Sequence, residues 1–167
     1  MIPIGQYKFH ILGGQPSEKT MIKIDSLDFI ERTADYWHDA IFGLEQVNFN
    51  EKDKVFSMVI IRDIWEEAKV VEKKFLRTKY IVPRQKYLLT FTNVTKIELK
   101  ATEPVDAISD ISYNPNYNEI RIECAKNTRI VLKVEKLNGK LEEIGNKFFD
   151  NTKYYTTVFG IESVEYE

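Results

Sequence analysis

The sequence is poor in the residues from which metal sites, disulfides and catalytic centres are most often built. Its 167 residues include one cysteine and two histidines. A single cysteine excludes an internal disulfide, and no paired-cysteine or histidine-rich spacing typical of a zinc site occurs. Glycine-rich phosphate loops, nucleophile elbows and Cys–His pairs with a third orienting group are also missing. We therefore expect no metal and no cofactor, and the sequence by itself reveals no activity.

Long hydrophobic runs and a strong excess of one charge are missing too. No segment approaches the roughly 18 apolar residues of a membrane span, and no basic region followed by a long apolar run opens the chain. The formal net charge is −2, whereas proteins that bind by neutralising phosphates are usually more basic. We expect a cytoplasmic protein that binds neither membranes nor nucleic acid.

The residues that are abundant indicate a folded core. Hydrophobic residues make up 43% of the chain and aromatic residues 13%, which provides enough large apolar side chains for one domain spanning residues 1–167. Ile120, Ile122 and Cys124 alternate with charged residues along a predicted strand, which places Cys124 on the apolar face. We therefore expect its thiol to be buried and inert.

The clearest structural signal is a β-hairpin over residues 119–136. Apolar and charged residues alternate from 119 to 124 and again from 129 to 135, the period of strands with one dry face. We predict a three-residue loop of residues 125–127 between them. Asn127 then takes the left-handed position, which asparagine tolerates better than most residues.

Charge pairing selects the register of this hairpin. With the three-residue loop, Glu119 faces Lys133 and Glu123 faces Arg129. A slip of two residues would place Arg121 opposite Lys133, and like charges directly across a strand pair are destabilising. A slip of one is excluded, because it would turn the apolar face outward.

The rest of the chain also predicts strands after one helix. Ser26 is the expected N-cap of a helix near residues 26–36, with Leu27, Ile30, Ala34 and Trp37 at helical spacing. The predicted extended segments are residues 7–12, 21–24, 40–50, 54–64, 87–99, 108–113, 153–158 and 161–166. Residues 87–99 form either one long bent strand or two strands joined at Asn93-Val94. Asn138-Gly139 predicts a two-residue hairpin turn, and residues 140–149 fit either a strand or a short helix.

These elements favour one fold class. Nearly all connections between the strands are short, so the sheets should be mainly antiparallel. Six or more strands with one N-terminal helix predict a mainly β protein, either an antiparallel β-sandwich or an open barrel.

Trp37, His38 and Asp39, at the junction of the helix and the next strand, form the first candidate site. A histidine beside a carboxylate is a possible general base. Adjacent residues of an extended chain point to opposite sides, however, so we do not expect Asp39 to orient His38. The alternative is a structural junction in which Trp37 packs under the sheet.

The second candidate is a basic segment over residues 66–86, read as an exposed loop or as a hairpin extended through Phe75 and Tyr80. Its binding candidates are Lys73, Lys74, Arg77 and Lys79, which would attract an acidic partner. The alternative is a solvated loop without a partner. A carboxylate metal site at Asp106 and Asp110 is disfavoured, because four residues of extended chain separate them by about 13 Å.

The third candidate is the C-terminal arm, residues 147–167, which is rich in aromatic side chains. These would either dock a second copy of the chain or pack back on the sheet and order the tail.

Four short motifs recur here in a recognisable order: Trp37-His38-Asp39-Ala40, the Phe91-x-x-Val94 step, residues 108–111 and a late strand ending at Cys124. In this the chain resembles small β-rich bacterial immunity proteins of polymorphic toxin systems. The resemblance covers residues 36–134 and implies a protein that covers the active surface of a cognate toxin. The basic segment and the aromatic tail have no counterpart in it.

Three functions follow as hypotheses. The leading one is a non-enzymatic, immunity-like protein that binds a toxin or another protein. The second is a small enzyme with a site around His38, and the third is a structural domain that self-associates through residues 147–167. No residue is assigned a catalytic role.

Overall fold

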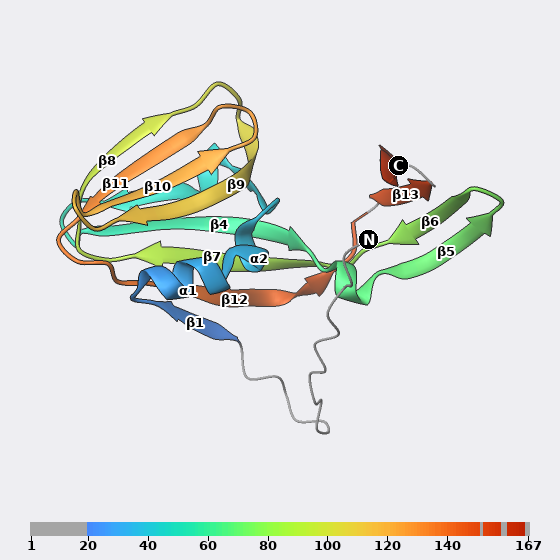
Figure 1. The fold of residues 1–167 in the computed structure, drawn as a ribbon, viewed down its shortest axis with the longest axis horizontal. Helices are drawn as coiled ribbons and strands as arrows, with labels where there is room; N and C mark the ends of the chain where they lie inside the picture. The colour runs from blue at the N-terminus through green and yellow to red at the C-terminus, as the bar shows by residue number, and fades with distance from the viewer. Residues whose placement is uncertain (1–19, 151, 158–159, 166–167) are drawn as a thin grey trace.

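The computed structural model describes residues 20–150, 152–157 and 160–165, and strands dominate this part of the chain (Figure 1). Every pair of neighbouring strands is antiparallel, as predicted. The predicted segment 7–12 lies outside the described residues. Ten strands form a large sheet: β1 Met21–Ile24, β2 Ile41–Gly43, β3 Val47–Asn50, β4 Val55–Asp63, β7 Arg84–Phe91, β8 Val94–Lys100, β9 Val105–Asn114, β10 Glu119–Cys124, β11 Arg129–Val134 and β12 Gly139–Phe148.

The large sheet bends over itself into two layers. Its order is β1-β12-β7-β4-β2-β9-β10-β11-β8, and β3 also pairs with β4. The short strand β2 pairs with β4 on one side and with β9 on the other, so the sheet bends there. Figure 1 shows β4, β7 and β12 in one layer and β8 to β11 in the other. The predicted sandwich is therefore an open one whose two layers belong to a single sheet.

Large apolar side chains fill the space between the layers. Phe56, Met58 and Ile60 of β4 are fully buried, as are Leu89 and Phe91 of β7. Facing them from the other layer are buried residues at alternate positions of β9, β10 and β11. Burial at every second residue is the period of two on which the strand predictions rested.

Two short helices take the place of the single predicted helix. They are α1 Leu27–Arg32 and α2 Ala34–Trp37, and the Ser26 side chain caps α1 by accepting a hydrogen bond from Phe29 N at 3.4 Å. At the break, the Thr33 hydroxyl donates to the carbonyl of Phe29, a local bond that competes with the regular helical ladder. The helices pack against β9, β1 and β4 and cover part of the open side of the sandwich (Figure 1).

The hairpin of β10 and β11 has the predicted register. Glu119 pairs with Lys133 and Glu123 with Arg129, with side-chain N–O distances of 2.6 and 2.8 Å. The loop is residues 125–127, and Asn127 has φ 67°. Alternating apolar residues and paired charges were therefore sufficient to predict this register.

The prediction of a hairpin turn at Asn138-Gly139 is wrong. The strand β12 that begins at Gly139 pairs with β7 and β1 in the opposite layer, not with β11. Glycine is required at 139 because a Cβ there would lie 2.5 Å from Cδ1 of the Phe91 ring. Residues 140–149 were left open between strand and helix, and β12 settles them as strand to Phe148.

The structure corrects one further predicted segment and decides an alternative in another. The hairpin around residues 51–53 is present as β3 and β4, but a 3-10 turn, Leu44–Gln46, interrupts the first strand and lets β2 reach β9. Of the two alternatives for residues 87–99, the structure has two strands joined at Asn93-Val94. Asn93 has φ 59°, and the chain crosses between the layers there, from β7 to β8.

A second sheet of four strands extends from one end of the sandwich (Figure 1). We call it the small sheet. Its order is β14-β13-β6-β5, with bounds Lys69–Lys74 for β5, Arg77–Ile81 for β6, Lys153–Thr157 for β13 and Gly160–Glu165 for β14. The basic segment is thus a hairpin, and the C-terminal strands pair with it. No helix in the described part of the chain is long and apolar enough to cross a membrane.

Candidate functional site

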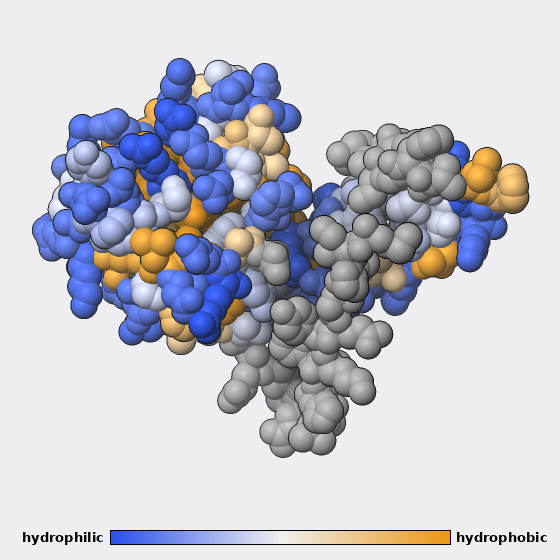
Figure 2. All heavy atoms as spheres, viewed as in Figure 1, coloured by the Kyte–Doolittle hydropathy of each residue, from blue (hydrophilic) through white to orange (hydrophobic). Residues whose placement is uncertain are grey.

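The most exposed large hydrophobic side chain of the described residues, Phe75, lies on the hairpin of β5 and β6. Phe75 is 91% exposed and Leu76 60% exposed, and these two residues, which we call the hairpin tip, form the turn between the strands. Figure 2 shows this hydrophobic end of the small sheet projecting away from the sandwich. Val70 and Val71 of β5 are also more than half exposed. Single exposed apolar residues are ordinary, but a group of four on one projecting hairpin is not.

The backbone of the hairpin tip is strained. Leu76 has φ 86°, in the region that favours glycine and asparagine. A bulky side chain there costs roughly 1 kcal/mol or more relative to glycine. The turn therefore holds an exposed leucine where a glycine would be more stable, which points to a use for the side chain itself.

The hairpin is strongly basic although the whole chain is slightly acidic. Residues 69–81 carry five basic side chains and one acidic side chain, a net charge of +4. Since the total is −2, the remainder of the chain carries −6. The positive excess is therefore local to the hairpin, within a chain that is acidic elsewhere.

The four basic binding candidates all lie on this hairpin, but in different surroundings. Lys73 is exposed, and Lys74 pairs with Glu72 at 2.7 Å. The Arg77 guanidinium lies 3.6 Å from the ring centroid of Tyr155, and the Lys79 ammonium lies 5.1 Å from it. Tyr155 of the C-terminal strand β13 thus holds two of the cations in place by cation–π contacts.

The free edge of the small sheet is protected against strand addition. Among the described residues, β5 pairs with β6 alone, and three of its six residues are lysines. The pairing register also shifts between Val70 and Glu72, which leaves Val71 as a bulge. Lysines and bulges are the usual devices that keep an edge strand from pairing with another strand. The hairpin tip is therefore more accessible to another molecule than the edge of β5.

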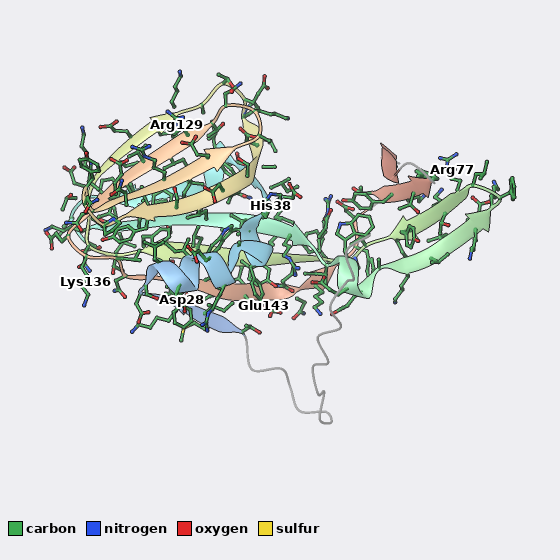
Figure 3. The ribbon with its side chains drawn as sticks, viewed as in Figure 1. Asp28, His38, Arg77, Arg129, Lys136 and Glu143 are labelled. Atoms are coloured by element: carbon green, nitrogen blue, oxygen red, sulfur yellow. The ribbon has the colours of Figure 1, made fainter. Side chains whose placement is uncertain are left out.

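A second feature is an open hollow of about 320 Å³ where the small sheet joins the sandwich. We call it the basal hollow. It is lined by His38, Asp39, Arg62, Asp63, Trp65 and Glu66. Figure 3 labels His38 on the sandwich side of this joint and Arg77 on the small sheet, well away from it.

His38 and Asp39 contact each other directly, contrary to the expectation from the sequence. His38 Nδ1 lies 3.0 Å from Asp39 Oδ2. The expectation assumed extended backbone, whereas Asp39 has φ 64°, which turns its side chain back toward His38. The pair is open to water, with His38 61% and Asp39 86% exposed at the side chain. A carboxylate orients the imidazole, as in a general base, but nothing around the pair excludes solvent.

Trp37 is not part of this surface. Its side chain is 1% exposed and belongs to the core between the layers. The structural alternative therefore holds for Trp37, while His38 and Asp39 pair with each other at the surface.

The wall of the basal hollow is braced by a polar cluster that sequence reasoning missed. Arg84 donates from Nε to Asp63 at 2.7 Å, from Nη2 to Tyr154 at 3.0 Å and from Nη1 to Asp150. The Tyr154 hydroxyl in turn donates to Asp63. Its members come from β4, β7, β13 and the segment before β13, and no local spacing in the sequence relates them.

The electrostatics of this cluster follow from its burial and its pairing. Burial, together with the hydrogen bond to Asp63, raises the pKa of Tyr154 to about 12. Burial acts to lower the pKa of Arg84, but the contacts with Tyr154 and Asp63 outweigh it and raise that pKa. Both groups hold their protons at neutral pH, so the cluster is a fixed brace rather than a proton-transfer site.

The described residues contain no group of three or more potential metal ligands. Asp106 is 2% exposed and accepts hydrogen bonds from the backbone N–H groups of Ala107, Lys126 and Thr128. Its role is to hold the β10–β11 loop. Cys124 is buried as predicted, and burial raises the pKa of its thiol to about 12.

Comparison with known proteins gives one match. The model of a family described as "Protein of unknown function (DUF2948)" matches residues 26–155. No curated protein and no solved structure matches the chain. The matched range runs from the N-cap of α1 to β13 and so includes the hairpin tip and the basal hollow.

Proposed function

We propose that this chain, which belongs to the DUF2948 family of proteins of unknown function, is a non-catalytic binding protein. It docks an acidic protein partner through its hairpin tip. The observation that carries the proposal is the tip itself. Phe75 is 91% exposed, and Leu76 is held at φ 86°. Buried aromatic anchors supply much of the energy of protein interfaces, and Phe75 is placed to act as one.

The charge of the partner follows from the cations around the tip. Lys73, Lys74 and Arg77 lie next to the two apolar residues, on a hairpin with a net charge of +4. An apolar pocket rimmed by carboxylates would fit this arrangement. The local excess of positive charge at the hairpin would also steer an acidic partner toward the tip.

Inhibition of a toxin is one form that this binding would take. The resemblance to immunity proteins covers residues 36–134, and the basic hairpin is an insertion without a counterpart there. In this proposal the sandwich serves as a scaffold, and the insertion supplies the contact specific to the partner. A toxin encoded beside this protein would be the first partner to test.

The experiment is affinity capture from the source cells, followed by kinetics with the identified partner. The test variant carries Phe75→Ser and Leu76→Asn, since asparagine tolerates a positive φ. The matched control is Leu99→Ser, which removes an apolar residue 46% exposed on β8, far along the chain from the hairpin.

We expect the wild type and the Leu99→Ser variant to retain the same acidic partner and the tip variant to lose it. Added salt should slow association with the purified partner, because the encounter is steered by charge. Recovery of an unchanged set of partners by the tip variant would overturn the proposal.

A further inference from the structure

We infer that the basal hollow receives the hairpin tip of a second copy of this chain. The contact goes beyond the proposed function, because it assigns a ligand to a site that the docking of an acidic partner does not use. It joins two different surfaces, the tip of one copy and the hollow of the next, so the association is head-to-tail.

The basal hollow offers an aromatic wall and carboxylates at its rim. Trp65 is 37% exposed, and its ring makes edge contacts with Tyr154 at 4.9 Å and Tyr80 at 6.3 Å between ring centroids. Asp39 and Glu66 are the most exposed lining carboxylates, at 86% and 63% of their side chains. Each has one partner in the hollow, His38 for Asp39 and Arg62 for Glu66, and keeps most of its side chain open to a second one. The volume of about 320 Å³ lies at the small end of ligand pockets and suits one large side chain.

The hairpin tip supplies the complementary groups. Phe75 provides a ring that would pack against Trp65. Lys74 and Arg77 directly flank the turn, with Cβ atoms about 5 Å apart. Lys74 also pairs with Glu72, and Arg77 stacks on the Tyr155 ring, so both cations are held near the tip. Docked on the hollow, these cations would meet Asp39 and Glu66.

The tip cannot enter the hollow of its own chain. Trp65 and Glu66 lie at the base of the small sheet, and the six residues of β5 separate them from the tip. Six residues of strand span roughly 20 Å. The hairpin is also pinned along its length by the pairing of β6 with β13. The occupant must therefore come from another molecule.

A symmetric contact between two hairpins is disfavoured by charge. Antiparallel pairing of β5 with its own copy about Val71 would place Lys69 opposite Lys73. Like charges across a strand pair are destabilising, and the bulge at Val71 disrupts the edge further. A head-to-tail contact instead brings opposite charges together. It does not close by symmetry, so association should continue beyond dimers as concentration rises.

The test is sedimentation analysis of the full chain from micromolar to near-millimolar concentration, at low and high salt. The tip variant carries Phe75→Ser and Leu76→Asn, as in the capture experiment, and the hollow variant combines Asp39→Asn with Glu66→Gln. Leu99→Ser again serves as the control. Far-UV circular dichroism and hydrogen exchange of the β5–β6 amides establish that each variant keeps the hairpin.

For the wild type and the control we expect a mass that rises with concentration and falls with salt. Each variant alone should remain at 19.6 kDa. An equimolar mixture should form a dimer that does not grow, because one variant keeps a hollow and the other keeps a tip. A wild type that stays monomeric throughout overturns the inference, and so does a mixture that stays monomeric.

The hollow variant also separates this inference from the proposed function. It keeps the tip and should still capture the acidic partner, whereas the tip variant should lose both interactions. If the tip variant fails to capture the partner but the wild type stays monomeric, the inferred self-association is refuted and the proposed function stands. If the wild type self-associates but the tip variant still captures the same partners, the proposed function is refuted and the inferred self-association stands.

Discussion

Arg84 Nη2 lies 3.0 Å from the phenolic oxygen of Tyr154, and this hydrogen bond joins the large sheet to the small sheet. Arg84 begins β7, whereas Tyr154 lies on β13 and reaches it from 70 residues further along the chain. Asp63 accepts from both groups. The position of the hairpin tip relative to the sandwich therefore depends on a compact set of charged and polar side chains.

Replacement of Arg84 by methionine should destabilise this joint. The Arg84 side chain is 13% exposed, and its loss would leave Asp63 and Asp150 half-buried without their cation. We expect the free energy of unfolding in urea to fall by about 3 kcal/mol. Lys96→Met, which breaks an exposed pair with Glu98, should leave it nearly unchanged, because solvent screens such a pair. If Arg84→Met and Lys96→Met changed the free energy of unfolding equally, the cluster around Arg84 would not stabilise the joint between the two sheets.

Asp106→Asn should weaken the β10–β11 hairpin. The carboxylate accepts three backbone N–H groups, and an asparagine amide would turn a donor toward at least one of them. We expect a loss of about 2 kcal/mol in urea unfolding. Asp110→Asn, on the same strand but exposed, is the matched control and should be close to neutral. A neutral Asp106→Asn would contradict the assigned role.

The contribution of Asp106 should depend on pH. Burial acts to raise the pKa of Asp106, but the hydrogen bonds from Thr128, Lys126 and Ala107 outweigh it and hold the pKa below 3.8. A carboxyl whose pKa is lowered on folding stabilises the native state above that ordinary value and loses the effect as pH falls through the folded value. The stability difference between wild type and Asp106→Asn should therefore shrink below about pH 4. Paired unfolding curves from neutral to acid pH measure it, and a difference that grows in acid would contradict it.

Cys124 should react slowly with thiol reagents in the native protein. Burial raises the pKa of this thiol from 9.0 to about 12, so at pH 8 the thiolate is roughly a thousand-fold rarer than in an exposed cysteine. We expect labelling with a disulfide reagent to be at least about a hundred-fold slower than in denaturant. If labelling were equally fast in native protein and in denaturant, the C-terminal end of β10, where Cys124 lies, would open readily in the native state.

Gly139→Ala should test the packing at the crossover into β12. Its Cβ would lie 2.5 Å from the Phe91 ring and 2.8 Å from the carbonyl oxygen of Thr90. Such crowding typically costs about 1–3 kcal/mol in unfolding free energy. The loss should be smaller in a Phe91→Leu background, where the ring is absent. An unchanged loss in that background would assign the effect to the backbone contact alone.

The sequence by itself determined the local pairing of this protein. Alternation and the charges Glu119, Glu123, Arg129 and Lys133 predicted the β10–β11 register, because cross-strand neighbours a few residues apart leave one arrangement with a dry face and paired charges. The capped first helix and the mainly antiparallel strands followed from the same local rules. The exposed basic hairpin was also predicted, as one of two alternatives, and the binding candidates on it were named.

Only the tertiary structure decided which strands and side chains that are distant in the sequence lie next to each other. Asn138-Gly139 has the local signature of a hairpin turn, yet Phe91, from β7 in the opposite layer, requires the glycine for packing. The contact of His38 with Asp39 depends on the left-handed backbone of Asp39, which no sequence pattern around that residue predicted. The brace of Arg84, Asp63, Asp150 and Tyr154 and the basal hollow beside it arise where distant strands meet. Such sites depend on long-range packing, whereas sequence periodicity reports which face of a strand is buried and not which strand covers it.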